Sequence, residues 1–263
     1  MLVGICVIGV ILNHGDETHK VHFADDLSSF TVDGIKFDLV YVNGGDFFMG
    51  VTDSTNMSQK DEYPRHRVKV PSFYIGKYPV TQEQWKVVMG NNPSYYKGDN
   101  HPVEGISWFD AIEYLRKLSI LTGREFTLPT EAMWEYAAIG GEHLDYEILY
   151  SGDNNPNQAG WYADNSSSTT HPVGLKKPNK LGLYDMSGNV WEWCTDYYDP
   201  KYYSNCWDSI SDKGPQGAYK ANWRVFRGGS IQLPATEMRV NNRDCYEPSG
   251  KDHDIGFRLI MIP

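Results

Sequence analysis

Apolar residues recur every three or four positions in three stretches of the chain, and these patterns predict amphipathic helices. A capping box that begins at Thr81 precedes the first stripe, and Gly90 follows it. Ser107 precedes the second stripe, and Gly123 follows it. A shorter helix is expected from Thr130 to Ala138. The two longer stripes consist of Trp85, Val88 and Met89, and of Trp108, Ala111, Ile112, Leu115 and Leu118.

Period-two alternation of apolar and polar residues predicts short strands elsewhere in the chain. The dipeptide Asp33-Gly34 lies between two β-prone pieces of residues 30–37 and is a strong hairpin signal. Two more strands are expected within residues 38–49, around Gly44-Gly45, and another within residues 68–75.

The segment from Gly182 to Cys194 combines a turn with a strand whose two faces differ. Trp191 and Trp193 point to one face, so this segment is predicted to be a core strand. Glu192 lies on the other face, and with Asp185 and the carbonyl groups between them it offers hard oxygen ligands that suit Ca²⁺. A calcium site is therefore expected. The alternative is that Glu192 caps a neighbouring loop through hydrogen bonds.

These elements predict an α+β fold with mostly short antiparallel strands, few helices and large loop content. Residues 152–180 and 195–223 lack periodicity and are expected to be loops. One domain is expected over residues 30–263, after an N-terminal extension, residues 1–29, for which the pattern predicts no definite structure. The apolar run at residues 1–12 is too short to cross a bilayer, so no transmembrane span is expected.

The net charge of −10, without a basic run to offset it, excludes nucleic acid as an expected partner and disfavours an anionic membrane surface. The spacing of the four cysteines fits neither a zinc ribbon nor a redox CxxC motif. A disulfide between Cys206 and Cys245 stays open, because it requires an oxidising compartment.

Eight blocks of the chain occur in the order in which they are found in one known family. They are residues 42–50, 62–66, 74–81, 102–108, 128–138, 182–194, 227–230 and 255–259. With these blocks the chain resembles the formylglycine-generating enzyme family, also called sulfatase-modifying factors, over roughly residues 37–263. The resemblance implies a C-type-lectin-like fold enlarged by irregular segments.

The resemblance also implies a set of calcium ligands at four positions of the central block. They are the side chain of Asp185, the backbone carbonyls of Gly188 and Val190, and the carboxylate of Glu192. The expected cofactor is thus a structural Ca²⁺ ion.

Family members that make formylglycine bind Cu(I) through two thiolates, and soft sulfur ligands suit this ion. The two positions lie three and eight residues after Ser230 and are occupied by Leu233 and Met238. Neither residue can supply a thiolate. No copper is therefore expected, and the chain is not expected to catalyse the parent reaction.

An intact scaffold without the thiolate pair favours a non-catalytic binding or display protein. The segment between residues 227–230 and 255–259 resembles, in its place, the variable segment of the bacterial or phage proteins of diversity-generating retroelements. The expected binding surface consists of Gln232, Leu233, Thr236, Glu237, Asn242, Asp244, Tyr246, Lys251 and His253.

The ligand is expected to be a protein or another cell-surface molecule, and an extracytoplasmic or surface-displayed location is favoured. The first alternative is a non-diversified envelope pseudoenzyme or assembly component. The third hypothesis is a copper-dependent formylglycine-generating oxidase.

Overall fold

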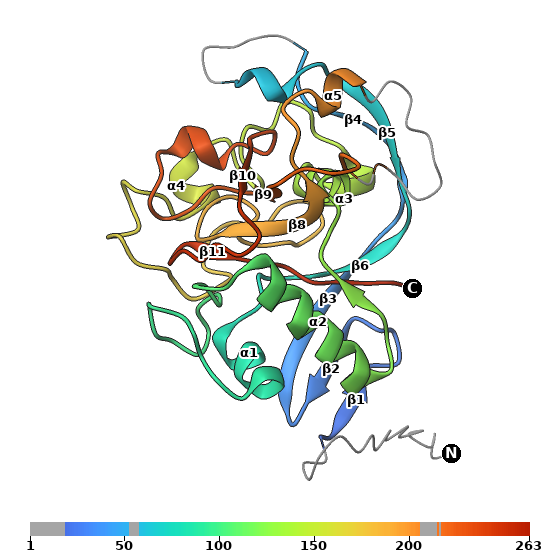
Figure 1. Cartoon of the computed structure of the whole chain (residues 1–263), viewed down its shortest axis with the longest axis vertical. Helices are drawn as coiled ribbons and strands as arrows, with labels where there is room; N and C mark the ends of the chain where they lie inside the picture. The colour runs from blue at the N-terminus through green and yellow to red at the C-terminus, as the bar shows by residue number, and fades with distance from the viewer. Residues whose placement is uncertain (1–18, 53–57, 206–214, 216) are drawn as a thin grey trace.

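Short strands in three sheets form the framework of the described part of the chain, and the helices pack against them (Figure 1). The computed structural model describes residues 19–52, 58–205, 215 and 217–263. The strands are β1 (Val21–Phe23), β2 (Ser29–Val32), β3 (Ile35–Val42), β4 (Gly45–Met49), β5 (His66–Val70), β6 (Phe73–Gly76), β7 (Phe126–Thr127), β8 (Trp191–Tyr197), β9 (Arg224–Arg227), β10 (Arg243–Tyr246), β11 (Ile255–Gly256) and β12 (Ile260–Met261).

The helices are few and mostly short, as the sequence predicts. The α-helices are α1 (Gln82–Met89), α2 (Trp108–Thr122), α3 (Glu131–Ala138), α4 (Pro156–Ala159) and α5 (Tyr202–Asn205). Three 3₁₀ turns are η1 (Lys60–Glu62), η2 (Gly141–His143) and η3 (Ala235–Met238). The prediction of a sheet-rich α+β fold with few helices is confirmed.

The largest sheet has the strand order β1-β2-β3-β6-β12-β7, and all its neighbouring strands are antiparallel. The predicted hairpin joins β2 to β3, with Asp33 and Gly34 at φ 49° and 84°. β1 pairs Val21 with Val32, so the sheet begins within the segment that the sequence analysis separates as an extension. A strand of three residues is too short for its alternation to be recognised.

The strand expected at residues 68–75 is in fact two strands in different sheets. β5 pairs with β4, whereas β6 lies between β3 and β12. Pro71 separates them, and its missing N–H prevents a continuous ladder. Nearby, a Cβ at Gly44 would lie 2.5 Å from the carbonyl carbon of Pro71, so this close approach requires glycine.

The second sheet has the order β10-β9-β8-β11, and β11 pairs with β8 in parallel. The core strand predicted from Trp191 and Trp193 is confirmed, and the opposite face of β8 is buried as well. Trp191 and Trp193 pack in one hydrophobic cluster with α1 and α2, and Cys194 packs in the other cluster with α3. After β11 the chain enters the largest sheet as β12, and thus links the two sheets.

The predicted caps of the helices are confirmed. The side chain of Thr81 accepts a hydrogen bond from the N–H of Gln84, and Ser107 does so from Asp110, in two capping boxes. Gly90 and Gly123 end these helices in the left-handed conformation. α1 and α2 lie side by side next to β1, β2 and β3 (Figure 1).

Candidate functional site

The segment that follows β9 is fixed at both of its ends. Gly228 and Gly229 have φ angles of 100° and 73°, and a Cβ at Gly229 would lie 2.7 Å from the carbonyl oxygen of Glu237. The hydroxyl of Ser230 donates to Oδ2 of Asp254 at 2.5 Å, which joins the start of the segment to its end. The residues between them form η3, β10 and the loops that connect these elements.

Two buried arginines anchor the neighbouring strands to α3. Arg227 on β9 pairs with Glu131 at 2.7 Å and with Glu135 at 2.5 Å. Arg243 on β10 pairs with the other oxygen of Glu131 at 2.8 Å. All four side chains are almost fully buried, so each charge depends on its partners. The network makes β9 and β10 a firm support for the segment.

The two positions at which the family's copper-binding thiolates would lie are occupied by packed side chains. Met238 is fully buried, and Leu233 is half-buried against the core that contains Trp191. A Cβ at Gly160 or Gly188 would lie 3.1 or 2.7 Å from the sulfur of Met238. The thioether therefore fills the space that these two glycines leave, as a core methionine does.

The described cysteine thiols are also poor candidates for a relocated copper site. Burial raises the pKa of the Cys194 thiol well above its ordinary value and that of Cys245 to about 12. Without a metal ion both thiols are therefore protonated near neutral pH, so copper binding there would have to displace two protons. Cys206 lies outside the described residues, so its expected pairing with Cys245 stays a prediction.

Most of the predicted binding surface is accessible to solvent. Gln232, Asp244, Lys251 and His253 are exposed, and Leu233, Thr236, Glu237 and Tyr246 are half-buried. For Asn242 the prediction of a surface position is wrong. It is fully buried, and its Nδ2 donates to the carbonyl oxygen of Glu237 at 2.9 Å. Its amide stabilises the loop, so it is not part of the surface.

The accessible residues contact two different parts of the fold. Lys251 pairs with Asp110 of α2 at 2.7 Å, and the ring of His253 stacks on Tyr95 with centroids 4.5 Å apart. Thr236 and Glu237 lie in η3, and Glu237 accepts a hydrogen bond from Asn242. The segment is therefore an extended surface that begins near η3 and ends near the start of α2.

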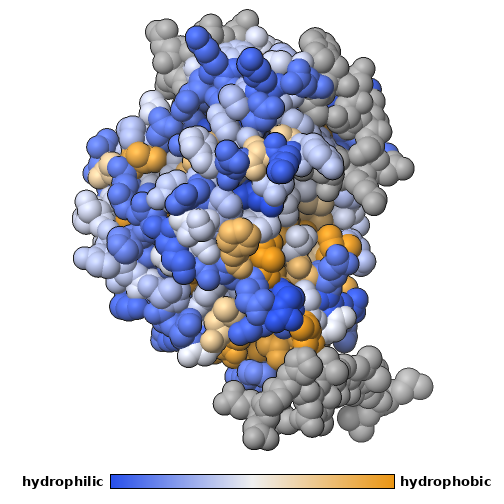
Figure 2. All heavy atoms as spheres, in the orientation of Figure 1, coloured by the Kyte–Doolittle hydropathy of each residue, from blue (hydrophilic) through white to orange (hydrophobic). Residues whose placement is uncertain are grey.

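Aromatic side chains from other elements border the α2 end of this surface, and they are not among the residues predicted from the sequence. Tyr95, Phe109 and Trp223 have exposed fractions of 63, 56 and 53%. The guanidinium of Arg224 lies 4.0 Å from the ring centroid of Trp108, and the backbone N–H of Trp108 donates to the carbonyl oxygen of Pro248. Figure 2 shows apolar side chains gathered over α2 on a face that is otherwise largely hydrophilic. The exposure of Phe109 could have been predicted from the sequence, because this residue lies outside the apolar stripe of its helix.

The predicted calcium ligands lie on the loop before β8 and at its start. Glu192 is fully buried, and Arg258 and the indole N–H of Trp134 bind its two carboxylate oxygens. Asp185 is also buried, and burial raises its pKa to about 6. Its Oδ2 accepts from Gly174 at 2.7 Å, but its Oδ1 has no hydrogen-bond partner.

These four positions fit calcium in part. Oδ1 of Asp185 is a buried oxygen that lacks a partner, which is the kind of atom that a cation would satisfy. Glu192 would have to share its carboxylate with Arg258. Within the described ranges, no group of three or more His, Cys, Asp or Glu side chains is placed to hold a metal ion.

In the part of the chain that the structure describes, no helix has the length and apolar character needed to cross a membrane. The apolar run at residues 1–12, on which the expectation from the sequence depends, lies outside the described residues.

Residues 35–262 match the family described as the sulfatase-modifying factor enzyme 1-like domain. The chain is 33% identical to the chaperone protein LppX of Paenibacillus barcinonensis, over 85% of this chain and 89% of that protein. It is similar in structure to Treponema denticola variable protein 1, with a TM-score of 0.79, 31% identity, and coverage of 89% of this chain and 98% of that one. PvdO from Pseudomonas aeruginosa has a TM-score of 0.74 and 27% identity, with 86% of this chain and 94% of that chain covered. The expected fold is thereby confirmed.

Proposed function

This chain belongs to the sulfatase-modifying factor enzyme 1-like family, and from that premise we propose that it is a non-catalytic binding protein on the family's scaffold. One observation carries the proposal. Packed Leu233 and Met238 occupy the positions at which the thiolate pair would lie. Without that pair the scaffold cannot hold Cu(I) as the formylglycine-forming members do.

The recognition surface that we propose consists of the exposed residues of the segment after β9 and the aromatic residues beside them. Asp244, Lys251 and His253 supply charges of both signs and hydrogen-bonding groups. Tyr95 and Phe109 supply large apolar area at the same end. Exposed aromatic residues surrounded by polar groups are typical of the centre of a protein–protein interface. A protein is therefore the proposed ligand class.

The similarity to Treponema denticola variable protein 1 supports this surface, because the two chains share the scaffold over most of their lengths. Outside η3 and β10, residues 232–253 are loops, and loops tolerate change without loss of the fold. We propose on this basis that the segment after β9 provides specificity, whether or not it is diversified.

A matched pair of triple variants tests the surface. The first combines Asp244→Ala, Lys251→Ala and His253→Ala. The control combines Asp46→Ala, Lys86→Ala and His143→Ala, which are exposed residues of the same types on β4, α1 and η2. Immobilised wild type, test variant and control are compared for the proteins that they retain from an extract of the source organism.

The proposal predicts a partner that the wild type and the control retain and the test variant loses, while all three proteins keep the same Tm. Equal retention by all three proteins would contradict the proposed surface.

An assembly component or chaperone of the cell envelope is the second candidate, and the identity to the chaperone protein LppX favours it. The two candidate functions predict different genes beside the gene for this protein. A reverse transcriptase and a near-copy of the segment that encodes residues 227–259 would support a diversified protein. A neighbouring gene for a secreted client, without such a copy, would support the chaperone.

We also propose that the protein is displayed outside the cytoplasm, which cell fractionation would test.

A further inference from the structure

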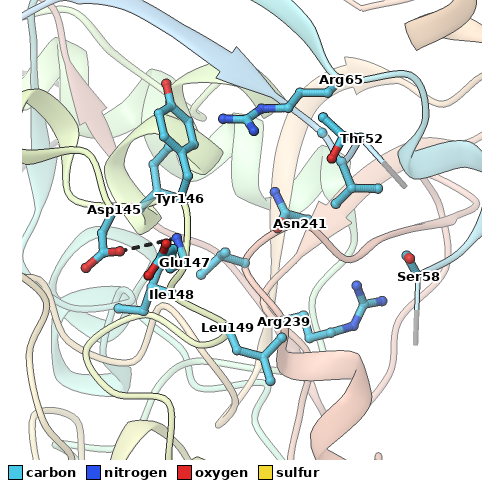
Figure 3. Close-up of a pocket in the computed structure, with 14 residues that line it drawn as sticks. Thr52, Ser58, Arg65, Asp145, Tyr146, Glu147, Ile148, Leu149, Arg239 and Asn241 are labelled. Atoms are coloured by element: carbon cyan, nitrogen blue, oxygen red, sulfur yellow. Dashed lines mark hydrogen bonds between the residues drawn. The ribbon is translucent and has the colours of Figure 1, made fainter. Parts of the chain in front are cut away.

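A pocket of about 340 Å³ is lined by residues that are not assigned to the proposed recognition surface. Its walls come from residues 50–52, 58 and 65 between β4 and β5, from residue 139 after α3, from residues 145–149 after η2, and from residues 239–241 (Figure 3). Its volume is that of a site for a small organic molecule. Neither the family's thiolate positions nor the proposed calcium ligands line it.

Arg65 provides a positive charge at one end of this pocket. Its guanidinium carbon lies 4.2 Å from the ring centroid of Tyr146 and 5.3 Å from that of Phe48. The hydroxyl of Tyr146 accepts a hydrogen bond from the N–H of Phe48 at 2.9 Å, which fixes the ring beneath the cation. Stacking of this kind orients a guanidinium without using its N–H donors.

The Nε donor of Arg65 is buried and has no hydrogen-bond partner. No carboxylate of the described residues lies within ion-pair distance of this guanidinium. A buried donor without an acceptor is costly, and an anionic acceptor is the partner that best offsets that cost. Arg65 therefore indicates the place of a negatively charged group.

The other charges that line the pocket are already balanced or lie in solvent. Arg239 makes two hydrogen bonds to Glu62, at 2.8 and 2.7 Å. Asp145 pairs with Lys180 at 3.1 Å. Glu147 is exposed, so water screens its charge. Arg65 is thus the cation that these neighbours leave uncompensated.

Apolar side chains lie at the opposite end of the pocket, beside Glu147 and Arg239 (Figure 3). Figure 3 shows Ile148 and Leu149 across the pocket from Arg65, with Asn241 between them. Ile139 and Val240 also line the pocket. A ligand that reaches from Arg65 to this end needs a charged group and an apolar body.

We propose that this pocket binds a small organic carboxylate with an apolar body. The two oxygens of a carboxylate match the planar fork of a guanidinium. One arginine compensates a single negative charge, whereas a phosphate monoester carries nearly two near neutral pH. The site is independent of the proposed function, because its residues differ from those of the proposed recognition surface.

Calorimetry with two probes of the same shape tests the charge. N-acetylphenylalanine carries the carboxylate, and N-acetylphenylalaninamide replaces it with a neutral amide. The acid is expected to bind the wild type about tenfold more tightly than the amide, as a charge-assisted hydrogen bond predicts. Phenyl phosphate is the third probe and is expected to bind more weakly than the acid.

Variants locate the site. Arg65→Gln is expected to remove the preference for the acid. Arg67→Gln is the matched control, because Arg67 lies two residues further, is exposed and pairs with Asp46. It is expected to bind as the wild type does. Ile148→Trp fills the apolar end without altering a charge and is expected to weaken binding of both the acid and the amide.

Three results would overturn the proposal. They are equal binding of acid and amide by the wild type, an unchanged preference in folded Arg65→Gln, and tighter binding of phenyl phosphate than of the acid. If Arg65→Gln does not fold, the Ile148→Trp variant decides, and unchanged binding of the acid to it would reject the pocket.

Discussion

Arg258 binds both carboxylate oxygens of Glu192, with its Nε at 3.0 Å from Oε2 and its Nη2 at 2.8 Å from Oε1. Both side chains are fully buried, so neither charge can turn to water. Arg258 also donates to the carbonyl oxygens of Gly76 and Tyr184. This pair therefore ties β8 to the largest sheet and to the loop that precedes β8.

Glu192→Gln is expected to lower the free energy of unfolding by about 3–5 kcal/mol, because it leaves the Arg258 cation buried without its counter-charge. Urea unfolding of the two proteins measures the loss. Glu113→Gln, which alters an exposed ion pair with Arg116, is the control and should change stability by less than about 1 kcal/mol. A loss equally small in Glu192→Gln would contradict the structural role of the pair.

Calcium is expected to stabilise the protein through Asp185, whose Oδ1 lacks a partner. A ligand that binds only the folded state adds about 2.7 kcal/mol at a hundredfold excess over its Kd. EDTA should therefore lower the Tm of the wild type, and Asp185→Ala should remove that difference. Because Glu192→Ala destabilises the protein with or without calcium, Asp185 is the better position for this test. An unchanged wild-type Tm in EDTA would reject the calcium proposal.

Asp196 is expected to make stability fall as the pH rises. Burial, with the nearby charge of Glu131, raises the pKa of Asp196 to about 7. The folded state therefore keeps its proton at a pH where the unfolded chain, with a pKa of about 3.9, has lost it. The stabilisation is complete below about pH 4 and is lost as the pH rises to about 7.

Asp196→Asn keeps an oxygen to accept from the N–H of Glu131 but cannot titrate. The difference in unfolding free energy between the wild type and this variant should thus change between pH 4 and 7 and be constant above about pH 8. A difference that is independent of pH would show that Asp196 does not titrate in this range.

Asn242 and Asp244 are two residues apart and should respond differently to replacement. Asn242→Ala removes the buried amide that bonds to Glu237, which should cost about 1–3 kcal/mol. Asp244→Ala alters an exposed residue and should leave stability within about 0.5 kcal/mol. Thermal unfolding of both variants provides the comparison. Equal destabilisation would contradict the division of this segment into support and surface.

Local signals predicted the parts of the fold that local contacts build. The capping boxes at Thr81 and Ser107, and the turn at Asp33-Gly34, depend on residues within a few positions of each other, and all of them were predicted. The core face of β8 followed from the large side chains of Trp191 and Trp193 at alternate positions. The break at Pro71 was readable in principle, because proline cannot donate to a ladder.

Contacts between distant segments could not be predicted in this way. Asn242 looks like a surface residue in sequence, but its Oδ1 accepts from the side chain of Gln59 at 3.4 Å, 183 positions away. Arg65 and Tyr146 likewise meet only in the folded chain. No periodicity in the sequence relates such pairs. Neither the burial of Asn242 nor the pocket could therefore be predicted from the sequence.

The most direct test of the central proposal is the mass of a Cys-x-Pro-x-Arg peptide after incubation with the purified protein, Cu(I) and O₂. Because Leu233 and Met238 supply no thiolates, the peptide mass should stay that of the free cysteine form, while a formylglycine-generating enzyme in parallel converts it. A loss of mass that corresponds to cysteine-to-formylglycine conversion, and that grows with time and protein concentration, would contradict the account of this chain as a binding protein.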